Sequence, residues 1–136
     1  MAKNMIYRYD GEKTRERAVP SGTQSGTPLL VNARPCVTLT ARGDATRTET
    51  RNGITITYAN GGVGNLPAEA TVAYDGTWEF SSITGVTTST GQDVAVYITS
   101  GGVLTLTSSG NTLYGYTDYP RDYVKAAGIA PVRIGA

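Results

Sequence analysis

The side chains that could carry out acid–base or metal chemistry are few and scattered in this chain of 136 residues. Histidine, the commonest general base and metal ligand, does not occur in the sequence. The eleven carboxylates are spread along the chain, and only close pairs such as Asp118 and Asp122 could share a site. A glycosidase-type acid pair would also need an aromatic-lined cleft, and the chain has one Trp and one Phe. The sequence therefore predicts no enzyme, and no catalytic, cofactor-binding or metal-binding residues.

Three other reactive or ligand-binding motifs are incomplete. Cys36 is the only cysteine and lies in an apolar run, as expected for a small buried residue. The glycine-rich segment 61–64 lacks the Lys-Ser/Thr and the following helix of a phosphate-binding loop. Residues 42–44 spell the integrin-recognition tripeptide Arg-Gly-Asp, but three residues recur by chance and no secretory signal accompanies them. We interpret both segments as ordinary loops.

Tyrosine is the informative aromatic residue. Four of the nine tyrosines crowd a short segment of the C-terminal third, and these are Tyr114, Tyr116, Tyr119 and Tyr123. Such a group could stack on sugars or nucleic-acid bases, or could form a patch between subunits. Only one basic residue, Arg121, is interleaved with them, which disfavours nucleic acid. We therefore expect core or interface packing and treat the four tyrosines as subunit-interface candidates.

Charge and composition restrict the partners and the fold class. Twelve basic and eleven acidic residues nearly balance, so net charge predicts neither nucleic acid nor a membrane as partner. Residues 1–51 hold nine of the basic and five of the acidic side chains, an asymmetry that could orient the domain on a partner. Charged residues make up 17%, against roughly 25% in an average domain. Twenty-one Thr and seventeen Gly indicate an all-β chain.

The element pattern predicts one mainly β domain of sandwich or barrel-like type. Short apolar or alternating segments recur at roughly 8–12-residue intervals between turn signals, as in a sandwich or barrel. Residues 1–20 are polar and are expected to form an extended N-terminal arm or an edge strand, and residues 21–136 form the β domain. The expected strands are 28–31, 36–41, 54–58, 70–80, 94–98, 103–107, 112–117 and 130–134.

Four connecting segments are less regular. Residues 42–53 read as a polar, charged loop, and residues 59–66 as a glycine-rich connection. Asp75-Gly76 predicts either a hairpin turn or a glycine bulge within one long strand. Residues 118–128 could form at most one short helix, beginning at Pro120 and ending at Gly128.

No signal peptide or membrane span is expected. Polar and charged residues follow Met1 to Asn4 without an apolar signal core, and no stretch approaches the length of a membrane span. We expect synthesis in a cytoplasm and no membrane partner.

Several segments together resemble the small capsid decoration, or cement, proteins of tailed bacteriophages. The similarity covers nearly the whole chain, in order: residues 1–4, 25–31, 71–80, 91–97, 110–116 and 132–134. The second of these begins Ser25-Gly26-Thr27-Pro28, where the family has Ser-Gly-Asp-Pro. The chain departs from the family in a charged insertion near residues 42–65 and in the segment 118–130.

The resemblance implies a fold like that of the phage lambda head decoration protein and a homotrimer at local threefold positions on the outer capsid surface. The arm would then bind the major capsid protein by adding a strand to one of its sheets, with Asn4, Met5, Ile6, Tyr7, Arg8 and Tyr9 as capsid-contact candidates. The same resemblance favours an interrupted strand at Gly76 over a hairpin. It places the protein on the virion.

Two other classes of function remain open from the sequence. The Tyr- and Thr-rich β composition also suits an adhesion or carbohydrate-binding module. Another virion part, such as a head fibre or tail-tube subunit, would share the β composition but assemble differently.

Overall fold

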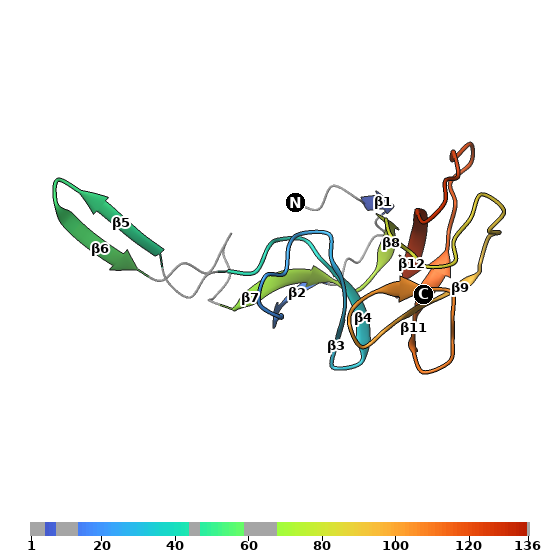
Figure 1. The fold of residues 1–136 in the computed structure, drawn as a ribbon, viewed down its shortest axis with the longest axis horizontal. Coiled ribbons are helices and arrows are strands. Elements are labelled where there is room, and N and C mark those ends of the chain that lie inside the picture. Colours follow the sequence, from blue (N-terminus) through green and yellow to red (C-terminus); the bar gives the residue numbers. More distant parts are fainter. Residues whose placement is uncertain (1–4, 8–13, 44–46, 59–67, 136) are drawn as a thin grey trace.

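The computed structural model describes residues 5–7, 14–43, 47–58 and 68–135, which form three antiparallel sheets and contain no helix (Figure 1). The six-stranded sheet has the order β1 (Met5–Tyr7), β8 (Gly76–Phe80), β12 (Ala130–Ile134), β11 (Thr112–Thr117), β9 (Ala95–Ile98) and β10 (Leu104–Thr105). The four-stranded sheet has the order β2 (Thr14–Ala18), β7 (Glu69–Ala73), β4 (Arg34–Thr38) and β3 (Pro28–Val31). The two-stranded sheet joins β5 (Arg47–Arg51) to β6 (Ile54–Tyr58). The mainly β prediction is confirmed.

The chain passes from the four-stranded to the six-stranded sheet at Asp75-Gly76. Strand β7 ends at Ala73 and β8 begins at Gly76, and the two strands pair with different neighbours. A hairpin at this dipeptide is therefore excluded. Gly76 has φ 102°, a value that glycine adopts without steric cost, and the Trp78 indole donates to the Asp75 carbonyl at 2.8 Å. The interruption is a corner between two sheets, as found where strands switch layers.

The main core lies between the six-stranded and the four-stranded sheets. Val96 and Ile98 of β9 are buried, as their alternation predicted. Trp78 and Phe80 of β8 contribute the largest side chains to this core. The facing sheet supplies Val37 and Ala73.

A second, smaller core covers the opposite face of the four-stranded sheet. It contains Val19, Cys36, Ala70, Val72 and Tyr74. Strand side chains alternate between faces, so β4 sends Cys36 to one core and Val37 to the other. The two inner strands of this sheet, β4 and β7, thus bury side chains on both faces.

Three fully buried threonines join loops to these sheets. Thr38 Oγ1 donates to the Gln24 carbonyl at 2.6 Å and accepts from the Thr27 amide at 2.9 Å. Thr117 makes the same kind of double contact, donating to the Gly91 carbonyl at 2.7 Å and accepting from the Val94 amide at 2.9 Å. The third, Thr77, donates to the Asp118 carboxylate at 2.6 Å.

The prediction that residues 42–53 form a loop is wrong for residues 47–51. These residues are strand β5, paired along its whole length with β6. The turn between them is Asn52-Gly53, with φ values of 50° and 76°, a two-residue hairpin turn of type I′. The prediction overlooked this strong hairpin signal. The glycine-rich connection 59–66 lies outside the described residues.

Segment 118–128 contains turns in place of a helix. The Tyr123 amide donates to the Pro120 carbonyl at 3.1 Å, and Asp122 at φ 65° lies within this turn. A bridge between Ala126 and Ile129 follows. A left-handed residue cannot continue an α-helix, so the chain turns back onto the sheet instead.

Candidate interaction surfaces

The four tyrosines do not form one exposed platform. Tyr114 is buried in the main core, where its hydroxyl donates to the Cys36 carbonyl at 2.6 Å and its ring packs edge-on against Phe80. Burial raises the pKa of Tyr114 well above its ordinary value. Tyr114 therefore braces the two sheets. Tyr116 differs, because 41% of its surface is exposed.

Tyr119 and Tyr123 pack on each other, with ring centroids 5.5 Å apart. The Lys125 ammonium lies 4.5 Å from the Tyr119 ring centre and donates to the Thr90 carbonyl. The Tyr123 hydroxyl donates to Glu79 of β8. Burial, and then the bond to the Glu79 carboxylate, raise the pKa of Tyr123. These two tyrosines fasten the turns of segment 118–128 onto the six-stranded sheet.

The capsid-contact candidates fall at the start of the chain. Met5, Ile6 and Tyr7 form β1, while Asn4, Arg8 and Tyr9 lie outside the described residues. Strand β1 pairs with β8 and is the outermost strand of its sheet, and β2 is outermost in the four-stranded sheet. The first twenty residues therefore supply an edge strand to each of the two larger sheets. An outermost strand presents backbone groups that a further strand can pair with.

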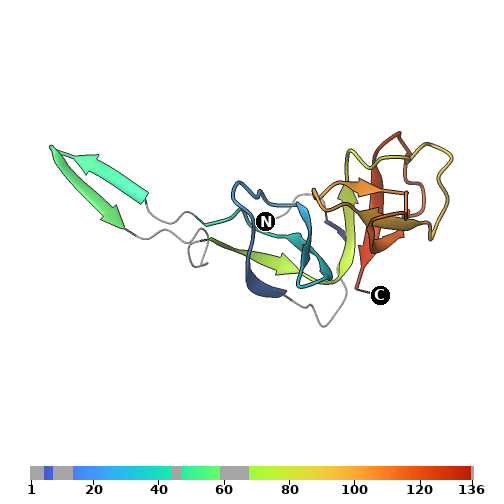
Figure 2. The same ribbon diagram turned by 60° about the horizontal axis from the view of Figure 1, so that its bottom comes forward.

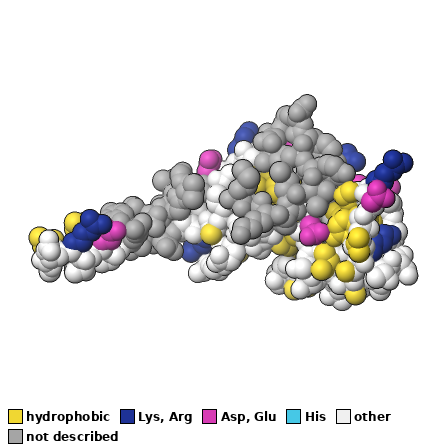
Figure 3. Space-filling model, turned by 90° about the horizontal axis from the view of Figure 1, so that it is seen from above, with side chains coloured by type: hydrophobic (Ala, Val, Ile, Leu, Met, Phe, Trp, Pro, Cys, Tyr) yellow, Lys and Arg dark blue, Asp and Glu magenta, His cyan; other side chains and the backbone are white. Residues whose placement is uncertain are grey.

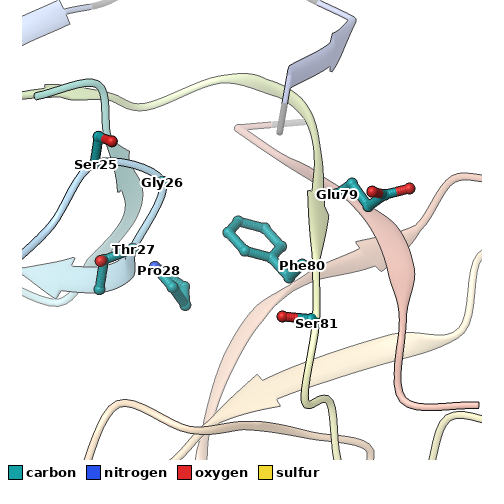
Figure 4. A pocket seen from close by; sticks show the side chains of 7 residues that line it. All are labelled: Ser25, Gly26, Thr27, Pro28, Glu79, Phe80 and Ser81. Atoms are coloured by element: carbon teal, nitrogen blue, oxygen red, sulfur yellow. The ribbon is translucent and has the colours of Figure 1, made fainter. Parts of the chain in front are cut away.

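A shallow cleft separates the two large sheets near the motif Ser25-Gly26-Thr27-Pro28. This loop faces Glu79, Phe80 and Ser81 across a volume of about 370 Å³. Figure 4 shows the Phe80 ring directed toward the loop and the Glu79 side chain directed away from it. The lining holds no nucleophile–base pair. Its apolar and hydroxyl groups suit packing or weak polar contacts.

The β5–β6 hairpin carries exposed isoleucines. Ile54 and Ile56 are 65% and 55% exposed, although their alternation had predicted a half-buried strand. They lie directly opposite Arg51 and Glu49 and therefore share a face with them. The other face is a ladder of threonines, Thr48 with Thr57 and Thr50 with Thr55. The hairpin is thus amphipathic, with one mixed apolar and charged face.

A second apolar surface lies between β11 and β12. These strands pair through Tyr116–Arg133 and Thr117–Val132, and beyond this ladder a groove of about 290 Å³ opens. Tyr114 and Ile134 are buried in its lining, whereas Leu113 and Tyr116 are 43% and 41% exposed. Figure 3 shows hydrophobic side chains at the hairpin tip and over the six-stranded end of the molecule.

The residues singled out for metal or thiol chemistry lie apart from one another in the described part of the chain. No group of three or more Cys, Asp or Glu residues there could hold a metal ion. Asp118 accepts a hydrogen bond from Thr77. Cys36 is fully buried, and burial raises its pKa to about 11, so the thiolate that reacts is suppressed.

Comparisons with known proteins return no relatives: no protein-family model, curated protein or solved structure matches the chain. The described residues contain no helix with the length and apolar character needed to span a membrane.

Proposed function

We propose that the chain is a capsid decoration protein of a tailed bacteriophage. It binds the outer surface of the major capsid protein at local threefold positions as a homotrimer, and it stabilises the mature shell. The observation that carries this proposal is the ordered series of family-like segments from residues 1–4 to residues 132–134. The mainly β fold is consistent with it.

The physical task of such a protein is binding alone. A capsid under internal pressure is stabilised by any domain that bridges several coat subunits only in their mature arrangement. By linkage, the mature state then gains the free energy of that binding. Threefold repetition adds avidity without new contacts.

The two edge strands near the start of the chain support a strand-addition contact. Strand β1 offers its outer edge to a coat-protein strand while β8 holds its inner edge. In this arrangement residues 5–7 and 14–18 of the arm already form strands. They therefore lose less conformational entropy on binding than a disordered arm would lose.

Carbohydrate binding has weaker support. A sugar platform needs exposed aromatic faces, and Tyr114 and Tyr119 are buried. No specific observation favours a head-fibre or tail-tube role, and solution mass separates these from a small trimer.

The test uses virions of the phage that encodes the chain, with the chain stripped off and added back. We expect it to sediment with mature capsids, to leave immature capsids unbound, and to raise the temperature at which mature capsids rupture. Absence of the chain from purified virions, or rupture at an unchanged temperature, would overturn the proposal.

The arm is tested by deleting residues 2–7. A larger deletion that reaches Ala18 would also remove β2, which pairs along its length with the buried strand β7, and would destabilise the domain. The shorter deletion removes only β1 and should lower capsid binding at least about tenfold. Full binding by this variant would exclude β1 from the contact.

A further inference from the structure

One face of the four-stranded sheet carries three arginines, two of them on its border strand β2 (Figure 2). Arg15 is paired with Val72 of β7. Arg17 is paired with Ala70 in the same ladder. Directly paired residues of antiparallel strands share a face, and Val72 and Ala70 belong to the smaller core. Both arginines therefore lie on the face of the sheet that carries the smaller core.

The third arginine, Arg34 of β4, reaches the same face from the other side of β7. Its guanidinium lies 4.2 Å from the centre of the Tyr74 ring, and Tyr74 is part of the smaller core. Burial raises the pKa of the Cys36 thiol to about 11, and the charges of Arg34 and Arg17 partly oppose this rise. Both guanidinium groups are therefore close to Cys36. We call the surface formed by Arg15, Arg17 and Arg34 the arginine face.

The acidic residues of the four-stranded sheet lie on its other face. Its four strands contain two of them, Glu16 and Glu69. Glu16 stands between Arg15 and Arg17 on β2, and successive side chains of a strand point to opposite faces. Glu69 is paired with Ala18, which lies on the same side as Glu16. The strands of this sheet thus supply the arginine face with positive charge alone.

Within the described part of the chain, the three guanidinium groups form no ion pair. Arg15 donates to the Thr14 carbonyl at 2.7 Å. Arg17 donates to the Glu16 carbonyl at 3.0 Å, and the contact of Arg34 is with an aromatic ring. A guanidinium carries five N–H donors, so most of these donors have no partner among the described residues.

The spacing of the arginine face suits carboxylates. Arg15 and Arg17 are two positions apart on one strand, which is about 7 Å, and acidic side chains at alternate positions of an extended segment have the same spacing. The planar guanidinium group binds a carboxylate through two parallel hydrogen bonds. Nucleic acid fits less well, because the aromatic residue of this face, Tyr74, is only 4% exposed and cannot stack on a base.

We propose that the arginine face binds an extended acidic segment of a partner protein, which lies along β2 with Asp or Glu at alternate positions. The carboxylates pair with Arg15 and Arg17, and Arg34 adds a further positive charge from across β7. This contact uses side chains and differs from strand addition at β1. It does not depend on the decoration role, because peptide binding and capsid binding are separate measurements and each can fail without the other.

The probe is a capped heptapeptide of alternating Thr and Glu, titrated into the isotope-labelled full chain at low ionic strength. Nuclear magnetic resonance should show saturable shifts of the arginine Nε–H signals of the face, with a dissociation constant below about 5 mM. Raising the salt concentration should weaken binding, because both partners are exposed charges. Absence of saturable shifts would overturn the proposal.

Two control peptides separate charge from spacing. The peptide with Gln in place of each Glu should cause no shifts. The peptide with its three Glu residues in consecutive positions has the same charge, but neighbouring side chains of an extended segment point to opposite sides. It should bind at least about threefold more weakly. Equal binding of the two acidic peptides, or tighter binding of a short oligothymidylate, would overturn the proposal.

The matched variants each remove one charge. Arg17→Gln keeps part of the methylene stem that can shield the small core, and it should weaken binding of the alternating peptide at least about threefold. Arg121→Gln removes the same charge from an exposed turn and should leave binding unchanged. Circular dichroism verifies that both variants are folded. Equal weakening by the two variants would show that net charge alone attracts the peptide, and it would overturn the proposal.

Discussion

At the scale of single residues, threonine has two roles in this protein: it covers exposed strand surfaces, and it makes buried hydrogen bonds. Threonine fits strand surfaces, and the hairpin ladder of Thr48, Thr50, Thr55 and Thr57 is of that kind. Thr38, Thr77 and Thr117 instead have no exposed surface and bind loop backbone or an Asp side chain. Each hydroxyl makes the hydrogen bond that water would make to these polar groups if they were exposed.

Thr38→Val should therefore destabilise the domain by about 1–3 kcal/mol, because the Thr27 amide loses its acceptor and the Gln24 carbonyl keeps only the Thr27 hydroxyl as a donor. Urea unfolding followed by tryptophan fluorescence measures this. The matched control, Thr55→Val on the exposed hairpin, should change stability by less than about 0.5 kcal/mol. Equal effects at the two positions would contradict the assigned role of burial.

Cys36 should make stability depend on alkaline pH. Its pKa is raised from 9.0 to about 11 by burial, so the folded chain keeps a proton that the unfolded chain releases. The thiol's contribution is fully present below pH 9 and is lost as pH rises through 11, by at most about 3 kcal/mol. The stability difference between the wild type and Cys36→Ala should be constant below pH 9 and narrow between pH 9 and 11. A stability difference that stays constant to pH 11 would refute the thiol assignment.

At the scale of elements, the pairing of β11 with β12 depends on a glycine. A Cβ atom at Gly115 would meet the Arg133 carbonyl oxygen and approach Val132 Cγ1 at 2.9 Å. The two strands can approach this closely only because residue 115 has no side chain. The same approach shapes the groove beside it, which Gly115 lines.

Gly115→Ala should cost at least about 2 kcal/mol, since backbone atoms must move to admit the methyl group. Thermal unfolding measures the loss. Gly91→Ala is the matched control, because its Cβ would meet nothing within 4 Å and its φ is not left-handed. The alanine at position 91 should change stability by less than about 0.5 kcal/mol, and a tolerated Gly115→Ala would mean that β12 can shift.

At the scale of the whole molecule, the hairpin is an addition to a domain that closes without it. The Gly43 amide donates to the Glu69 carbonyl at 2.9 Å, and the Ala68 amide donates to the Gly43 carbonyl at 3.0 Å. The chain thus leaves and re-enters the four-stranded sheet at adjacent points. None of the core residues of either cluster comes from β5 or β6.

Replacing residues 44–67 by an Asn-Gly turn should therefore leave a folded domain, with a thermal midpoint within about 5 °C of the wild type. The near-ultraviolet circular dichroism of Trp78 should also be retained. Loss of cooperative unfolding would contradict the independence of the core.

The sequence by itself determined the fold class and many of the strands. Alternation at Val96 and Ile98, and the apolar segment ending at Ile134, depend only on local pattern, and β11 and β12 have the predicted bounds. The β5 strand was missed although Asn52-Gly53 signalled it locally, because its charged residues were taken for a loop. A helix at residues 118–128 was allowed by spacing alone and is excluded by the turn at Asp122.

Only the tertiary structure decided which alternating residues face a core and which face water. Ile54 and Val96 have the same local pattern, yet one lies on a lone hairpin and the other lies between two sheets. Strand neighbours that are distant in sequence likewise decided between a hairpin and an interrupted strand at Asp75-Gly76. They also determine the burial of Tyr114 and the groove beside Tyr116. Burial is set by what packs against a face, and side-chain periodicity specifies the face without specifying its partner.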